Sequence, residues 1–167
     1  MADNWTQGSF AFRCTAAECA LLWEAQAAGH ALADGDDPDS PSAALLAAFP
    51  TDDESDPWSG FCKAFADPDF PSVGADFAFE VCADDLMARI ACFSSMVDFA
   101  PYGIALLIQR CCAGTLAKGP IGFEWAAVCS KPRIGEFGGG WCAVFVNRIE
   151  LETTAEVLDR ALSGGIL

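Results

Sequence analysis

The chain is short of positive charge and of histidine. Its 167 residues hold nine lysines and arginines against 24 aspartates and glutamates, and a single histidine, His30, so the formal net charge is −15. A protein with this balance repels nucleic acid and anionic lipid, and it attracts basic proteins from a distance. We therefore expect no direct contact with nucleic acid, no contact with a membrane, and a partner protein that is basic.

Long apolar runs are absent as well. The longest strongly apolar run, residues 104–108, is far shorter than the roughly 20 residues that span a bilayer. The first residues, MADNWTQGSFAF, lack the basic region and the apolar region of a signal peptide. These two absences predict a cytoplasmic protein without a membrane-spanning segment.

The spacing of the cysteines argues against a metal site. The nine cysteines are odd in number and include no C-x-x-C pair, and His30 is the only histidine that could complete a ligand set. Most of them lie in apolar or alternating segments, where a reduced cysteine behaves as a small hydrophobic residue. We expect no metal ion and no cofactor.

The motifs of common enzyme classes are also missing. No G-x-S-x-G, G-x-x-x-x-G-K-[ST] or G-x-G-x-x-G pattern occurs in the chain. His30 lies near the end of a predicted helix, a position that the helix dipole favours for an imidazole, and no nucleophile motif accompanies it. Paired catalytic carboxylates leave no sequence signature, because tertiary neighbours set their pKa values. On this basis the protein is expected not to be an enzyme.

What the chain does have is a hydrophobic content of 53%, enough for one core over residues 1–167. Residues 8–14, GSFAFRC, alternate as a half-buried strand does. Thr15 and Glu18 then form a capping-box pattern in front of an apolar run. This pattern predicts a helix over residues 16–29 or slightly beyond.

The second half of the chain contains two units of the same layout, each with two strands followed by a helix. The predicted elements are strands at 75–82 and 86–94 with a helix at 100–116, and strands at 121–130 and 141–151 with a helix at 153–163. With the N-terminal strand and helix, these units predict a single α+β domain. Its antiparallel sheet should have about five strands, with helices packed mainly on one face.

Residues 34–74 are predicted to form an acidic, proline-rich insertion. Six of the nine prolines fall within it and interrupt every apolar run. Twice, a capping side chain is followed by a proline suited to the first position of a helix. Short helices are therefore expected at about 41–49 and 57–65.

Aromatic residues give the insertion something to bury. Trp58, Phe61 and Phe65 share one face of the second short helix, so the segment should be ordered. Among the tryptophans, Trp58 and Trp5 are the candidates for an exposed anchor at an interface, where aromatic side chains concentrate binding energy. The remaining three are expected in the core: Trp23, Trp125 and Trp141.

The carboxylates of residues 34–85 are the strongest signal in the sequence, with 14 acids against Lys63 alone. They allow three interpretations: solvated surface, a protein-binding face that imitates a nucleic-acid backbone, or a metal or acid/base site. An EF-hand calcium loop is excluded, because the sixth and twelfth positions counted from Asp34 are not Gly and Glu. The candidate partner-binding residues are Asp34, Asp36, Asp37, Asp39, Asp52, Asp53, Glu54, Asp56, Trp58, Phe61, Asp67 and Asp69.

Residues 130–140 form a second candidate site, a long loop between two predicted strands. Lys131 and Arg133 precede three consecutive glycines, Gly138, Gly139 and Gly140. The glycines lead into a strand and not into a helix, so the loop lacks the geometry of a phosphate-binding loop. It is either a long hairpin loop or a ligand-binding loop. The two cations alternatively contact the protein's own acidic insertion.

These observations favour an acidic inhibitor or immunity-type protein. It would block a basic groove of a nuclease, of a defence complex such as a restriction or CRISPR system, or of a toxin, by competing with nucleic acid. One alternative is a small enzyme or ligand-binding domain that uses the 130–140 loop. Another is a structural subunit of a larger assembly, and the chain is expected to be a monomer or a homodimer.

Overall fold

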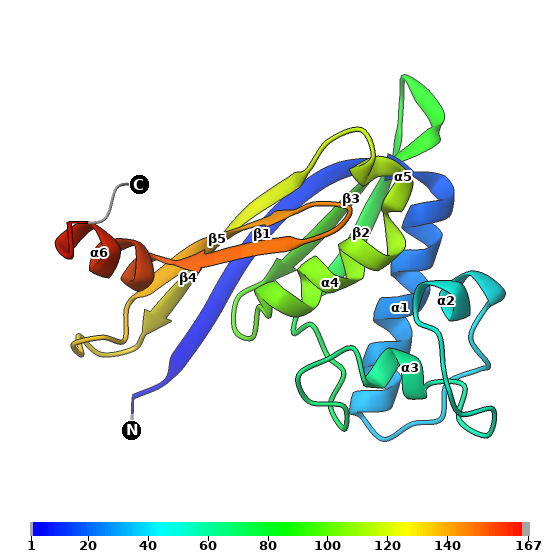
Figure 1. Cartoon of the computed structure of the whole chain (residues 1–167), viewed down its shortest axis with the longest axis horizontal. Coiled ribbons are helices and arrows are strands. Elements are labelled where there is room, and N and C mark those ends of the chain that lie inside the picture. The colour runs from blue at the N-terminus through cyan, green and yellow to red at the C-terminus, as the bar shows by residue number, and fades with distance from the viewer. Residues whose placement is uncertain (1, 165–167) are drawn as a thin grey trace.

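A computed structural model of the chain describes residues 2–164 (Figure 1). Its elements are, in order, β1 (Asn4–Thr15), α1 (Ala16–Ala33), α2 (Ala43–Ala48), α3 (Ser59–Cys62), β2 (Asp76–Cys82), β3 (Asp85–Ser95), α4 (Pro101–Cys111), α5 (Ala113–Leu116), β4 (Ile121–Cys129), β5 (Gly138–Val144), β6 (Ile149–Thr153) and α6 (Thr154–Leu162). The fold is α+β, with one open, antiparallel sheet and helices packed against it. This confirms the predicted class.

The sheet has the strand order β2-β3-β1-β4-β5-β6, and the long strand β1 connects its two halves. Residues 8–15 of β1 pair with β3, and residues 4–7 pair with β4. One strand can serve both halves because β1 is 12 residues long. The strands β2 and β6 are left as the two edges of the sheet.

The prediction of about five strands is wrong, because the sheet has six. The expected single strand over 141–151 is interrupted by a tight turn, in which the Phe145 N–H donates to the Arg148 carbonyl at 2.9 Å. The two residues between them include Asn147, a type of residue that favours turns. The chain thereby folds back on itself and forms the hairpin of β5 and β6.

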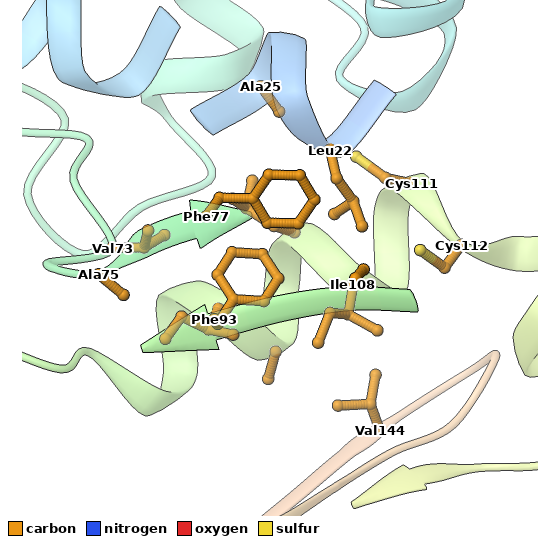
Figure 2. Close-up of a cluster of buried hydrophobic side chains, with 14 of the residues drawn as sticks. Leu22, Ala25, Val73, Ala75, Phe77, Phe93, Ile108, Cys111, Cys112 and Val144 are labelled. Carbon is orange, nitrogen blue, oxygen red and sulfur yellow. The ribbon is translucent and has the colours of Figure 1, made fainter. Parts of the chain in front are cut away.

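The main core lies between the sheet and the helices α1 and α4. Figure 2 shows Leu22 of α1 and Ile108 of α4 pointing toward Phe77 and Phe93 of the sheet. The ring centroids of these two phenylalanines are 4.9 Å apart. Phe77 and Phe93 therefore lie on the side of the sheet that faces the helices.

The opposite side of the sheet carries several small side chains near its middle. Ala78, Cys92 and Ala11 lie side by side across β2, β3 and β1, and Gly122 and Ala143 lie opposite each other on β4 and β5. Side chains of this size bury little apolar area. Larger side chains also lie on this side, among them Ile90 opposite Arg13 and Trp141 opposite Glu124.

The helix α1 begins at the predicted capping box. The Thr15 hydroxyl accepts from the Glu18 N–H, and the Glu18 carboxylate accepts from the Thr15 N–H at 3.0 Å. The same carboxylate accepts from the Thr115 N–H at 2.8 Å and from its hydroxyl at 2.7 Å, and thereby connects α1 to α5. Burial alone would raise the pKa of Glu18, but the hydrogen bonds from Thr115 and Thr15 outweigh burial and lower it.

The other helices differ from the predictions in length. The helix expected over 100–116 is divided at Cys112 into α4 and α5. The two short helices expected in the insertion are present as α2 and α3, but they are shorter than the predicted ranges 41–49 and 57–65. Within residues 2–164, no helix combines the length and the apolar character that crossing a membrane requires.

We predict that Glu18→Gln lowers the free energy of unfolding at pH 7 by about 1–2 kcal/mol, since an amide replaces a charged acceptor of several hydrogen bonds. The pKa of Glu18 is lower in the folded state than in the unfolded state. The stabilisation is therefore complete above the unfolded value of about 4.3 and is lost as the pH falls through the folded value. Urea denaturation of both proteins between pH 7 and pH 3 measures the difference.

The control is Glu124→Gln, at an exposed carboxylate of β4, which should change stability by no more than about 0.5 kcal/mol. A Glu18→Gln deficit that stays constant down to pH 3 would show that the carboxylate charge does not contribute.

Candidate functional site

Residues 34–74, which we call the acidic segment, form one end of the molecule. In Figure 1 they surround the C-terminal half of α1, far from α6. The segment contains α2, α3 and the loops that connect them to α1 and β2. It holds ten carboxylates and one cation, Lys63.

A cluster of aromatic side chains attaches the acidic segment to the rest of the fold. Phe61 is 1% exposed and lies at its centre. Its ring centroid is 5.0 Å from that of Phe49, 5.1 Å from that of Phe65 and 5.8 Å from that of Trp58. All four side chains are buried, so the segment is ordered by its own apolar residues.

The expectation that Trp58 is an exposed anchor is wrong, since only 7% of it is exposed. Phe61 is buried too, so neither residue is available to a partner in this conformation. The physical reason is that the segment has few other groups with which to form a core. Large aromatic side chains bury more area than any alternative in this stretch.

The carboxylates of the acidic segment, by contrast, all lie at the surface. The exposed residues are Asp34, Asp36, Asp37, Asp39, Asp52, Asp53, Glu54, Asp56, Asp67 and Asp69. The other four acids of residues 34–85 lie outside the segment. Asp76 and Glu80 lie on β2, and Asp84 and Asp85 lie at the β2–β3 turn, where both pair with Arg13.

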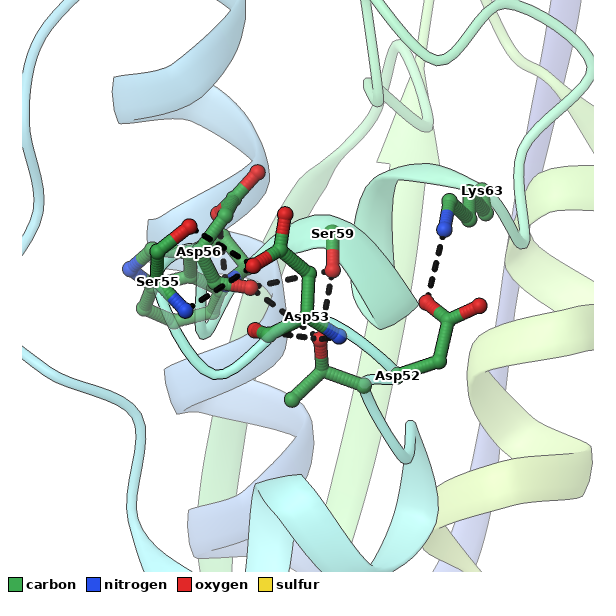
Figure 3. Close-up of polar contacts among 8 residues, drawn as sticks. Asp52, Asp53, Ser55, Asp56, Ser59 and Lys63 are labelled. Carbon is green, nitrogen blue, oxygen red and sulfur yellow. Dashed lines mark hydrogen bonds and ion pairs between the residues drawn. The ribbon is translucent and has the colours of Figure 1, made fainter.

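Figure 3 shows the polar contacts of the loop that contains Asp52 and Asp53. The Lys63 ammonium donates to Asp52 at 2.7 Å, and this hydrogen bond lowers the pKa of Asp52. Hydrogen bonds from the Ser55 hydroxyl and N–H lower the pKa of Asp53. Both carboxylates therefore stay ionised well below neutral pH.

The second candidate, the loop between β4 and β5, is shorter than predicted and ends at Phe137. The three glycines belong to β5 and pair with β4. A Cβ atom on Gly139, whose φ is 148°, would lie 2.2 Å from the Trp125 carbonyl oxygen, and one on Gly140 would lie 2.4 Å from the Trp125 ring. Close packing against Trp125 thus explains Gly139 and Gly140.

Lys131 and Arg133 are exposed, and neither forms an ion pair with another residue of the 2–164 range. Their loop lies at the other end of the sheet from the acidic segment, so the suggested contact with that segment does not occur (Figure 1). A cavity of about 450 Å³ lies beside the loop. Its lining includes the carboxylates Asp98 and Glu136 but neither of the two cations.

Three of the buried thiols lie among apolar residues, and His30 contacts a neighbouring side chain. Burial raises the pKa of Cys14 and Cys111 to about 12 and that of Cys142 to about 11, so these thiols are protonated at neutral pH. The Nε2 atom of His30 lies 2.8 Å from the Gln26 side-chain amide. Among the described residues, no group of three or more His, Cys, Asp and Glu side chains is placed to hold a metal ion.

An exposed apolar strip lies at the edge of the sheet and was not predicted from the sequence. Trp23, expected in the core, is 51% exposed and packs edge-to-face on Phe79 of β2, with ring centroids 6.0 Å apart. Val81, two residues further along β2, is also exposed. The alternating pattern of β2 identified the strand, but no local pattern indicates which strand lies at an edge. Trp5, expected to be exposed, is half-buried, as are Trp125 and Trp141.

We predict that Phe61→Ala lowers the free energy of unfolding by about 3–5 kcal/mol, the usual cost of removing a fully buried phenylalanine. Phe70→Ala is the matched control, because Phe70 belongs to the same segment but is 56% exposed. It should cost less than about 1 kcal/mol.

Chemical denaturation measures both values, and amide hydrogen exchange locates the effect. Exchange in Phe61→Ala should accelerate most within residues 34–74. Equal destabilisation by the two changes would contradict the role given to Phe61.

Comparison with protein-family models, with curated proteins and with solved structures found no match. The chain's own residues, and the surface that they form, are therefore the basis for a functional proposal.

Proposed function

We propose that the protein is an acidic inhibitor or immunity-type protein that occupies a basic groove of a nuclease, a defence complex or a toxin. The observation that carries this proposal is the acidic segment, in which ten exposed carboxylates share one end of the molecule with a single cation. A groove that binds nucleic acid is lined with cations that are spaced to meet phosphates. Carboxylates held at one end of a folded protein are a matching competitor.

Order in the segment supports this mechanism. A flexible acidic chain would have to lose conformational entropy on binding, and that loss lowers affinity. Here the buried contacts of Phe61 with Phe49, Trp58 and Phe65 hold the segment in one conformation before any partner arrives. Binding then costs less ordering, and the charges act together in steering the encounter.

A different side chain has to supply the short-range contacts first assigned to Trp58 and Phe61. Phe70 belongs to the same segment and is 56% exposed, between Asp67 and Asp69 on one side and the start of β2 on the other. An exposed aromatic group that follows Asp69 in the chain suits a partner surface that combines arginine with apolar residues.

The alternative of a ligand-binding site at the 130–140 loop has less support. An anionic ligand would need Lys131 and Arg133 at a cavity, and the cavity beside the loop is lined by carboxylates instead. Ligand binding at this loop, and a role as a structural subunit, stay predictions from the sequence.

We predict that the protein inhibits DNA cleavage by a basic nuclease, and that the triple change Asp36→Asn, Asp37→Asn and Asp39→Asn weakens inhibition about ten-fold at 50 mM salt, where steering is least screened. The assay follows cleavage of a fluorescent duplex by restriction, RNA-guided and toxin nucleases. Inhibition should decline as salt rises.

The charge-matched control is Asp3→Asn with Glu124→Gln and Asp159→Asn, three exposed acids outside the acidic segment. This variant should inhibit within about two-fold of the original protein. The proposal fails if no nuclease of the panel is inhibited at 50 mM salt, or if both triple variants lose inhibition equally.

A further inference from the structure

The edge strand β2 has an unpaired backbone edge and also exposes its side chains on both faces of the sheet. Residues 78–81 are exposed in succession, although they belong to a regular strand. The strand pairs with β3 on one side only, so its outer side presents backbone N–H and C=O groups to solvent. Proteins usually protect such an edge, because another chain can pair with it.

The two faces of this edge differ in chemistry. On the side that faces the helices, Phe79 and Val81 are 45% and 53% exposed, and Trp23 of α1 packs edge-to-face on Phe79. On the other side lie Asp76 and Glu80, two residues beyond Ala78 in either direction. An added strand would therefore meet apolar groups on one face and carboxylates on the other.

These two carboxylates have no cation within the described part of the chain. Asp76 and Glu80 lie opposite Ser94 and Ile90 of β3. Arg13, on the next strand, pairs with Asp84 and Asp85 at the turn, and Arg89 donates to the carbonyls of residues 86 and 88. The negative charge of the edge is thus available to a partner.

We propose that β2 binds an extended, basic segment of another protein by strand addition, with the segment's lysines or arginines opposite Asp76 and Glu80 and its apolar residues beside Phe79 and Val81. Backbone hydrogen bonds would supply affinity, and the alternation of basic and apolar residues would supply specificity. This inference rests on the proposed function only for the basic character of the partner.

The charges argue against a second copy as the occupant. Two β2 strands paired antiparallel about Ala78 would place Asp76 of each copy directly opposite Glu80 of the other. Like charges in such positions oppose pairing, and each copy carries a net charge of −15. The same carboxylates that oppose self-pairing favour a basic segment.

A cavity connects this edge with the acidic segment. It has a volume of about 950 Å³ and is lined by Asp76 at the start of β2, by Phe70 of the acidic segment and by His30. A basic segment on β2 would consequently extend toward the ten carboxylates of that end.

The test uses a capped peptide, KVKVKVKV, and a control peptide of equal charge in which the two central valines are replaced by proline. Proline removes backbone donors and disfavours strand pairing without changing charge. Calorimetry at 50 mM salt should show binding of the first peptide and binding of the proline peptide weakened by about ten-fold or more. Amide hydrogens within residues 76–82 should become protected by the first peptide only.

Two protein variants of equal charge change complete the test. Asp76→Lys with Glu80→Lys should weaken binding of KVKVKVKV by about ten-fold, since two favourable cross-strand pairs become repulsive. Asp36→Lys with Asp37→Lys, in the acidic segment, should weaken it by no more than about three-fold. Any of three outcomes would overturn the proposal. The two peptides bind equally, the two variants lose binding equally, or the protein forms a dimer that Asp76→Lys with Glu80→Lys abolishes.

The nuclease assay separates this inference from the proposed function. If peptide binding fails while inhibition by the acidic segment persists, only the strand-addition proposal is wrong. If the peptide binds as described but no nuclease is inhibited, β2 remains a docking edge and the inhibitor proposal is wrong.

Discussion

The packing of Phe61 is the contact on which the acidic segment depends. Ten carboxylates held at one end of a molecule repel one another, and a single ion pair between Lys63 and Asp52 offsets little of that repulsion. Burial of a large apolar side chain contributes about 1.5–3 kcal/mol, so Phe61 and the three buried aromatic residues around it are the main opposing force. The fit is close: a Cβ atom on Gly29 of α1 would lie 2.7 Å from the Pro71 carbonyl oxygen.

Charge and apolar surface are divided between two neighbouring regions. The acidic segment exposes its carboxylates and buries most of its aromatic residues, whereas the β2 edge exposes Trp23, Phe79 and Val81 beside only two carboxylates. The first region suits long-range attraction, which is sensitive to salt, and the second suits short-range contact, which is not. A partner that meets both would be oriented by the first and held by the second.

Local signals in the sequence predicted local structure well. The capping box predicted at Thr15 is present, because it depends on side chains only three residues apart, and Thr153 forms a second box of the same kind. The turn that separates β5 from β6 was missed, since the apolar pattern continues across it. The burial of Trp58 and the exposure of Trp23 were missed for a different reason: both follow from which elements lie beside them, and no short stretch of sequence records that.

The free thiols have a consequence for recovery after unfolding. All nine cysteines are unpaired, and most are buried with their sulfur atoms shielded from oxidants. Once the chain unfolds, the thiols whose pKa burial raises, among them Cys14, Cys111 and Cys142, regain an ordinary acidity. The exposed thiols can then form disulfides that the native core has no room for. Brief unfolding in air would thus become irreversible, because non-native disulfides would form. Outside a reducing solution, the half-life of the protein is then governed by its unfolding rate and not by its equilibrium stability.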